Sequence, residues 1–188
     1  MLRSGGAALA APVLDAVCAL YDEVFAAPPF AWRDDEPALH RARLTALLDD
    51  PTFGIVLAGD GGHLTGFGYG FTLSPQTRRW ADLSPPLPPP RSDEWPGRTF
   101  VLFDFAVRAS HRGRGLGRAI HDRLLGGRAE ERATLTVQPA AVATKAIYEH
   151  WGWRRVGTLT GGPTAAAPVF DAYLRDTLAD LRGGLTGE

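Results

Sequence analysis

A glycine-rich turn carries the clearest chemical signal in this sequence. Residues 108–118 read RASHRGRGLGR, and they follow an apolar stretch and precede a predicted helix. Gly113, Gly115 and Gly117 allow a tight bend and a close approach of the backbone to a ligand. The first N–H groups of a helix have no partner within the helix, and they bind phosphate oxygens. Three arginines add cationic donors at the same place: Arg112, Arg114 and Arg118. The turn therefore predicts a site for a ligand that contains phosphate.

Two common phosphate-binding motifs do not fit this turn. A P-loop requires a lysine after its glycines, and none follows here. A dinucleotide fingerprint reads GxGxxG, and Arg118 occupies its sixth position when the pattern starts at Gly113. The pattern that remains is Arg-Gly-x-Gly-x-Gly over residues 112–117. The alternative is a glycine-rich helix start without a ligand.

Asp104 is the single charged residue within the apolar stretch TFVLFDFAV, residues 99–107. Strand alternation predicts that Leu102, Asp104 and Ala106 share one face, opposite Phe103. A carboxylate among apolar neighbours needs a partner or a purpose. It could hold an ammonium group and relay its proton, or it could form a salt bridge with an arginine. Four further acids are weaker candidates, with a solvated helix end as their alternative: Glu23, Asp34, Asp35 and Glu36.

The elements that must position these residues follow from periodicity and turn residues. Helices are predicted over 12–26 and 36–49, and two strands, 53–58 and 63–73, are predicted to form a hairpin through residues 59–62. The later predicted elements are a strand at 99–107, a helix at about 115–126, a strand at 133–138, a helix from Pro139 to about His150, strands at 153–159 and 168–174, and a short final helix. Because a helix crosses over between them, the strands at 99–107 and 133–138 are predicted to be parallel.

Residues 74–98 show no periodicity. They contain seven prolines together with Trp80 and Trp95. A connection of this length in a compact domain is usually functional or disordered. We expect one domain over residues 1–188, with this Pro-rich segment as an inserted loop.

Composition excludes several classes of protein. The chain has 188 residues, of which 45% are apolar, and its formal net charge is −1, so a nucleic-acid surface or a polybasic membrane patch is not expected. The lone Cys18 rules out an internal disulfide, and the five histidines show no metal-ligand spacing. No apolar stretch approaches the roughly 18 residues of a membrane span. We therefore expect a cytoplasmic protein, monomeric or homodimeric, that holds no metal.

Taken together, the motifs resemble those of the GNAT superfamily of acetyl-CoA-dependent N-acetyltransferases. That family's pyrophosphate loop reads Q/R-x-x-G-x-G/A, and the matching positions are Arg112, Gly113, Arg114, Gly115, Leu116 and Gly117. A second family motif, N-x-x-A-x-x-x-Y-x-x-x-G-F, resembles residues 141–153, where the Tyr, the Gly and the final aromatic match in register. Ala141 stands where the family has Asn, and Thr144 where it has Ala.

The resemblance implies a mixed α/β (α+β) domain in which helices flank a central mixed sheet with two splayed parallel strands. It also implies that Tyr148 is the general acid that protonates the leaving thiolate, with a core aromatic like Trp151 and Trp153 as the alternative. Asp104 is the other expected catalytic residue. The implied contacts of acetyl-CoA are Phe105, Ala106 and Val107, the loop residues Arg112, Gly113, Arg114, Gly115, Leu116, Gly117 and Arg118, and Ala141 and Thr144.

The resemblance favours direct transfer of an acetyl group from acetyl-CoA to a primary amine, without a covalent enzyme intermediate. Because Asp104 would attract a cation, we expect a small basic or polyamine-like acceptor, such as an amino sugar, in preference to an anionic amino acid. Two alternatives stay open: a non-catalytic module that binds acyl-CoA, and a protein N-acetyltransferase that acts on a peptide. The acceptor itself cannot be identified from the sequence.

Overall fold

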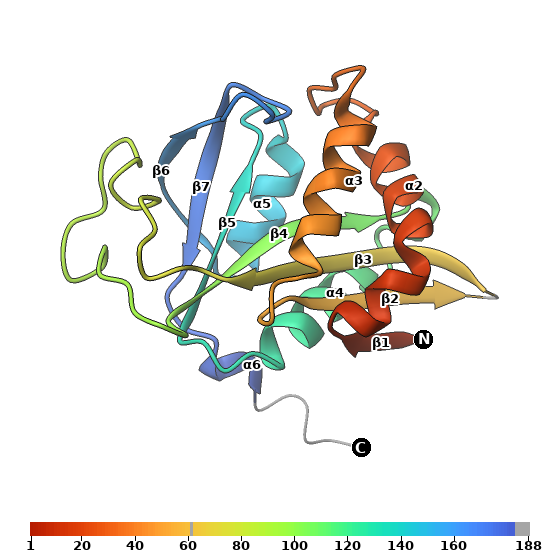
Figure 1. Ribbon diagram of the computed structural model, residues 1–188, viewed down its shortest axis with the longest axis horizontal. Helices are drawn as coiled ribbons and strands as arrows, with labels where there is room; N and C mark the ends of the chain where they lie inside the picture. The colour runs from red at the N-terminus through yellow and green to blue at the C-terminus, as the bar shows by residue number, and fades with distance from the viewer. Residues whose placement is uncertain (61, 183–188) are drawn as a thin grey trace.

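Within residues 1–60 and 62–182, which the computed structural model describes, seven strands form one sheet in the order β1-β2-β3-β4-β5-β7-β6 (Figure 1). The strands are β1 (Leu2–Gly5), β2 (Gly54–Asp60), β3 (His63–Thr72), β4 (Thr99–Val107), β5 (Arg132–Val137), β6 (Arg154–Thr160) and β7 (Val169–Arg175). All neighbours are antiparallel except β4 and β5, which are parallel as predicted. The mixed sheet confirms the expected fold class.

Helices cover both faces of the sheet. α2 (Leu14–Phe25) and α3 (Glu36–Leu47) form one buried cluster with β2 and β3, and we call this side the α2–α3 face. α4 (Leu116–Gly126) and α5 (Val142–His150) pack on the opposite, α4–α5 face. Figure 1 shows α2 and α3 in front of the sheet and α4 behind it. The short helical elements are α1 (Ala7–Ala10), α6 (Ala179–Arg182) and two 3₁₀ turns at Ala11–Val13 and Ala109–His111.

Most predicted elements are confirmed to within a few residues. The helix predicted from residue 12 starts with a 3₁₀ turn that contains Pro12, and α2 itself begins at Leu14. The predicted hairpin is present as β2 and β3, although Gly61 in its connection lies outside the described residues. The edge strand β1 was not predicted, because LRSG shows no apolar alternation; it pairs with β2 from Leu2 opposite Ala58.

The parallel strands β4 and β5 separate soon after they start. Their paired residues are Thr99 with Arg132, Phe100 with Ala133 and Val101 with Thr134. Among the described residues, no pairing of β4 with β5 follows Val101, although β4 remains paired with β3 as far as Val107. The expected splay is therefore present, and it leaves one edge of β4 without a strand partner.

A β-bulge in β4 changes which side chains share a face. Tyr69 pairs with Asp104 and Gly70 pairs with Leu102, so Phe103 is an extra residue without a partner in β3. Leu102 consequently packs with the α4–α5 cluster, whereas Ala106 packs with the α2–α3 cluster. The prediction that Leu102 shares a face with Asp104 and Ala106 is wrong, because simple alternation fails at a bulge.

The segment 74–98 contains no named helix or strand, yet it packs against the sheet. Trp80, Leu83 and Leu87 are buried in a cluster with Val101 of β4 and with β7. Val101 alternates with Phe100 and Leu102, which lie on the α4–α5 face, so the segment covers part of the α2–α3 face. A bridge between Ser84 and Thr158 also ties the segment to β6.

The bulge depends on the missing side chain of Gly70, which gives a first prediction. A Cβ atom at Gly70 would lie 1.8 Å from the carbonyl oxygen of Val101. Because that atom belongs to the backbone, Gly70→Ala must push β3 and β4 apart. We expect the free energy of unfolding in urea to fall by about 1–3 kcal/mol or more. The control is Gly162→Ala, whose Cβ would meet no atom within 4 Å. Equal midpoints for the two variants would contradict the proposed role of Gly70.

Candidate functional site

The glycine-rich turn forms the N-terminal end of α4, directly after β4 and the 3₁₀ turn. Gly113 and Gly115 have φ angles of +72° and +79°, in the left-handed region that favours glycine. Among the described residues, no side chain caps the helix, and none of the N–H groups of residues 113–118 donates a hydrogen bond outside it. These donors are therefore available to the oxygens of a phosphate, as the sequence predicted.

The three arginines of the turn have different surroundings. Arg112 Nε donates to the carbonyl oxygen of Val107 at 2.9 Å, so this side chain ties the turn to the end of β4. Arg118 is paired with Asp122, and its guanidinium lies 5.8 Å from the ring centre of Trp151. Arg114 is exposed and forms no ion pair with any described residue. Arg112 and Arg114 are both exposed and pair with no carboxylate of the described residues, so their charges are available to a ligand.

The residues Phe105, Ala106 and Val107 lie where β4 has left β5. Their backbone pairs with β3 through Gly68, Phe67 and Gly66. On the other edge no strand partner is present among the described residues. A chain-like ligand could therefore hydrogen-bond to this open edge of β4 and continue to the N-terminus of α4. The geometry fits the arm and pyrophosphate of acetyl-CoA.

Tyr148 is a buried residue of α5. Its ring packs edge-on against Trp151 and Trp153, with both centroid distances at 5.9 Å. Within the described chain, no group hydrogen-bonds to the Tyr148 hydroxyl. Burial raises the pKa of Tyr148, and the negative charge of Asp104 raises it further. The phenol therefore stays protonated at neutral pH. Tyr148 packs like a core aromatic, but its protonated hydroxyl is still compatible with a role as proton donor.

Asp104 lies on the α2–α3 face and is held by a short chain of hydrogen bonds. The hydroxyl of Tyr69 donates to Asp104 Oδ2. Since that proton is used, the Tyr69 oxygen accepts from His40 Nε2, which lies 3.1 Å away. His40 Nδ1 is buried without a partner, which fits a neutral ring with its proton on Nε2. The carboxylate is thus oriented through Tyr69, and no arginine of the described part of the chain forms the salt bridge that was the alternative.

The environment of Asp104 makes it a weaker acid than usual. Burial raises the pKa of Asp104 to about 6, against the lowering effects of the Tyr69 hydrogen bond and of Arg43. Burial also lowers the pKa of His40 to about 3, so this ring stays uncharged at neutral pH. Asp104 can therefore take up a proton near pH 6 while His40 does not compete for it.

Three polar residues behind Asp104 come from one side of α3. Glu36, His40 and Arg43 follow each other at spacings of four and three residues, which places them in one helical row. Glu36 accepts hydrogen bonds from Tyr21 at 2.9 Å and from Arg43 at 2.6 Å. The expectation of a solvated helix end is wrong for Glu36, which is 0% exposed. The i, i+4, i+7 spacing is the signal that could have identified this row.

None of the other predicted residues forms a hydrogen bond or ion pair with Asp104 among the described residues. Glu23 pairs with Arg108 and Asp35 pairs with Arg33, whereas Asp34 is exposed. Ala141 is buried at the start of α5, and Thr144 is half-buried one turn later. The proposed contacts of Ala141 and Thr144 with acetyl-CoA stay predictions.

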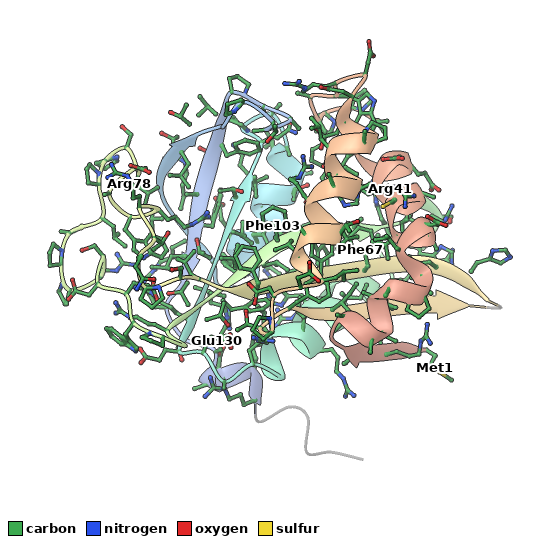
Figure 2. The ribbon with its side chains drawn as sticks, in the orientation of Figure 1. Met1, Arg41, Phe67, Arg78, Phe103 and Glu130 are labelled. Atoms are coloured by element: carbon green, nitrogen blue, oxygen red, sulfur yellow. The ribbon has the colours of Figure 1, made fainter. Side chains whose placement is uncertain are left out.

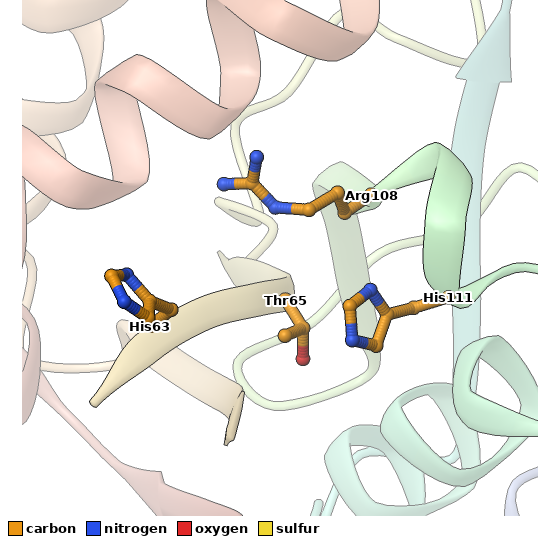
Figure 3. A pocket seen from close by; sticks show the side chains of 4 residues that line it. All are labelled: His63, Thr65, Arg108 and His111. Atoms are coloured by element: carbon orange, nitrogen blue, oxygen red, sulfur yellow. The ribbon is translucent and has the colours of Figure 1, made fainter. Parts of the chain in front are cut away.

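Two surface hollows flank the ends of β4 and β5. One has a volume of about 350 Å³ and is lined by the four residues in Figure 3, namely His63, Thr65, Arg108 and His111. The other measures about 360 Å³ and lies where Gln138, after β5, accepts a hydrogen bond from the Ala31 backbone N–H at 2.6 Å. Neither hollow is lined by Asp104 or Tyr148. The candidate site is therefore the opening where β4 separates from β5.

The described residues show no group of three or more potential metal ligands. In the same part of the chain, every helix is too short or too polar to cross a membrane.

Comparisons with known proteins agree with this geometry. A putative GNAT acetyltransferase from Desulfovibrio desulfuricans superposes with a TM-score of 0.65 at 15% identity, covering 95% of this chain and 99% of the other. An aminoglycoside 6′-acetyltransferase type Ii superposes with a TM-score of 0.63 at 14% identity, covering 95% of this chain and 97% of the other. The ribosomal-protein-S18-alanine N-acetyltransferase from Escherichia coli superposes with a TM-score of 0.59 at 17% identity, covering 93% of this chain and 91% of the other. These likenesses show the shared fold. Among curated protein sequences, none matches this chain.

The family model of the acetyltransferase (GNAT) family matches residues 17–153. This range includes α3, the splayed strands, the glycine-rich turn and Tyr148. The chain therefore belongs to the GNAT family of acetyltransferases.

Proposed function

We propose that this protein transfers the acetyl group of acetyl-CoA directly to the primary amine of a small molecule. One observation carries the proposal: the open edge of β4 joins the glycine-rich turn, whose N–H groups have no partner among the described residues, to Asp104, whose charge raises the pKa of Tyr148 on α5. The first feature suits binding of the pyrophosphate, and the second suits movement of protons.

Bound acetyl-CoA supplies a thioester that is open to attack by an amine. The chain's own residues hold the ligand through the open edge of β4 and the donors of residues 113–118. The Asp104 carboxylate accepts the proton that an ammonium group must lose before attack. The Tyr148 hydroxyl gives its proton to the departing sulfur, and the protein recovers its starting state when protons exchange with water.

The arrangement argues against a module that only binds acyl-CoA. Such a module has no use for a carboxyl group with its pKa raised to about 6. A protein substrate is the remaining alternative, and the tests below include peptides for that reason.

Thiol release provides the direct test of the proposed function. We expect purified protein with acetyl-CoA to release free thiol only when an amine is present, and faster with small amines than with peptides. Tyr148→Phe should lower kcat by about 10²–10⁴-fold, because the proton is needed in the transition state. Its affinity for CoA in calorimetry should be unchanged.

Tyr173→Phe is the matched control for that variant. It removes a phenol that donates to Glu149 at 3.0 Å, away from the proposed chemistry. Thiol release that needs no amine, or equal kcat values for the two variants, would contradict the role of Tyr148.

A second prediction concerns the glycine-rich turn. Gly115→Val places a branched side chain at a φ of +79°, where the backbone must approach a phosphate. We expect the Kd for CoA to rise about tenfold or more, because several hydrogen bonds to phosphate are lost. Gly97→Val carries the same strain at a φ of +79° in the segment 74–98 and serves as control. An unchanged Kd for the Gly115 variant would refute the assignment of the turn.

The pH dependence of kcat/KM tests Asp104. A carboxyl group with a pKa of about 6 is ionised above that pH, so activity should rise as the pH passes through about 6. Asp104→Asn should lose this limb and lower kcat by about 10²–10⁴-fold. Since the hydrogen bond from Tyr69 lowers the pKa of Asp104, Tyr69→Phe should move the limb to higher pH.

Asp82→Asn is the control for the charge change, because Asp82 is exposed and pairs only with exposed Arg78 among the described residues. If kcat/KM of Asp104→Asn still rises as the pH passes through about 6, the role of Asp104 is structural.

A further inference from the structure

Arg79, in the segment 74–98, is a partly buried cation that the proposed function does not use. Its Nε donates to Thr134 Oγ1 at 3.2 Å, while Nη2 is buried and has no hydrogen-bond partner. No carboxylate of the described residues pairs with it, whereas its neighbour Arg78 pairs with Asp82 at 3.3 Å. Burial lowers the pKa of Arg79 to about 10, so the guanidinium is still charged at neutral pH. A buried charge without a partner is unfavourable, and an anionic ligand would offset that cost.

The position of Arg79 relates it to the opening between β4 and β5. Thr134, which holds Arg79, pairs with Val101, and this is the last pair before the two strands separate. Val101 pairs with Phe71 of β3 and Asp104 pairs with Tyr69, so the bulge leaves Asp104 only two residue steps beyond Val101, about 7 Å at a rise of about 3.4 Å per residue. Thr134 and Asp104 both face the α2–α3 side of the sheet. The cation of Arg79 and the carboxylate of Asp104 therefore lie on the same face of the sheet, at different positions along β4.

Phe103 lies between these two charged groups. The bulge turns its ring toward Tyr69 and Phe71, with centroid distances of 6.2 and 5.7 Å, and leaves the residue 36% exposed. Figure 2 shows Phe103 in the middle of this face, between α3 and the strands β5 and β7. An exposed aromatic ring at this place offers contact to the carbon skeleton of a ligand.

We propose that Arg79 binds a carboxylate of the acceptor while Asp104 receives its ammonium group, so that the acceptor is an amino acid or a similar zwitterion. This inference rests on the proposed function, and it changes the expectation of a purely basic amine that Asp104 alone suggested. An arginine binds a carboxylate through charge-assisted hydrogen bonds. The carbon skeleton of the acceptor then lies against Phe103.

The proposal predicts a strong preference for ligands that carry the carboxylate. A ligand without the carboxylate leaves the guanidinium of Arg79 without an anionic partner, which weakens binding. An amino acid and its carboxamide share the same α-amino group and skeleton, and they differ in the carboxylate. We expect kcat/KM to favour the acid by about 10–100-fold, the effect of one hydrogen bond to a charged group.

The test uses the full-length protein, the standard L-amino acids and their carboxamides. Thiol release gives kcat/KM for each pair, and calorimetry in the presence of CoA gives the Kd of each N-acetyl amino acid and of its carboxamide. Arg79→Gln should bring the ratio of acid to amide toward one by raising KM for the acids, without changing the values for the amides. The matched control is Arg78→Gln, which removes an exposed neighbouring guanidinium and should keep the ratio of the wild type.

The outcomes separate the two proposals. Turnover of amines without a preference for the acids, or an equal loss for acids and amides in Arg79→Gln, overturns the role of Arg79 and leaves the proposed function intact. Binding of N-acetyl amino acids that depends on Arg79, without thiol release from any amine, overturns the proposed function and supports the carboxylate site. If no acid in the panel binds or reacts better than its amide, the carboxylate site is refuted.

Discussion

The close contact between Gly70 and the backbone of Val101 is the constraint on which the site depends. Only a residue without a side chain permits β3 and β4 to pair around the extra residue Phe103. Because of that extra residue, the side chain of Asp104 follows Phe103 on the same face, whereas Leu102 and Phe105 pack toward α4 and α5. The bulge therefore places a carboxylate on one face of β4 and preserves the apolar packing on the other.

The separation of β4 from β5 adds the second requirement of the site. Parallel pairing ends at Val101 and Thr134, and the open edge of β4 then leads to the N-terminus of α4. Arg112 stabilises this junction because its side chain donates to the last carbonyl of β4. One strand thus connects the groups that suit phosphate binding to the groups that suit proton transfer.

Much of this arrangement could be predicted from the sequence, since local signals determine it. Apolar periodicity, prolines and glycines located the helices and strands, and the crossover helix required β4 and β5 to be parallel. The bulge could not be predicted, because it depends on the pairing of Gly70 with a distant strand. The buried row of Glu36 and His40 was missed for a related reason: polar residues on a helix look solvated until the packing partners Tyr21 and Tyr69 are known. Arg79 lies in a segment without periodicity, so only the folded chain relates it to Thr134.

The balance of charge on the α2–α3 face follows from these contacts. Glu36 and Arg43 form an ion pair at 2.6 Å, and Tyr21 donates a second hydrogen bond to the same oxygen of Glu36. His40 stays neutral, so the row on α3 contributes orientation to Asp104 without adding net charge. Two charges remain without an oppositely charged partner among the described residues. The Asp104 carboxylate accepts a hydrogen bond from the Tyr69 hydroxyl, and the Arg79 guanidinium pairs with no acid. Two opposite charges, separated by the exposed ring of Phe103, are complementary to a ligand with the reverse charges at its ends. The inserted segment 74–98 therefore does more than cover apolar strands, because it brings the cation of that pair to the sheet.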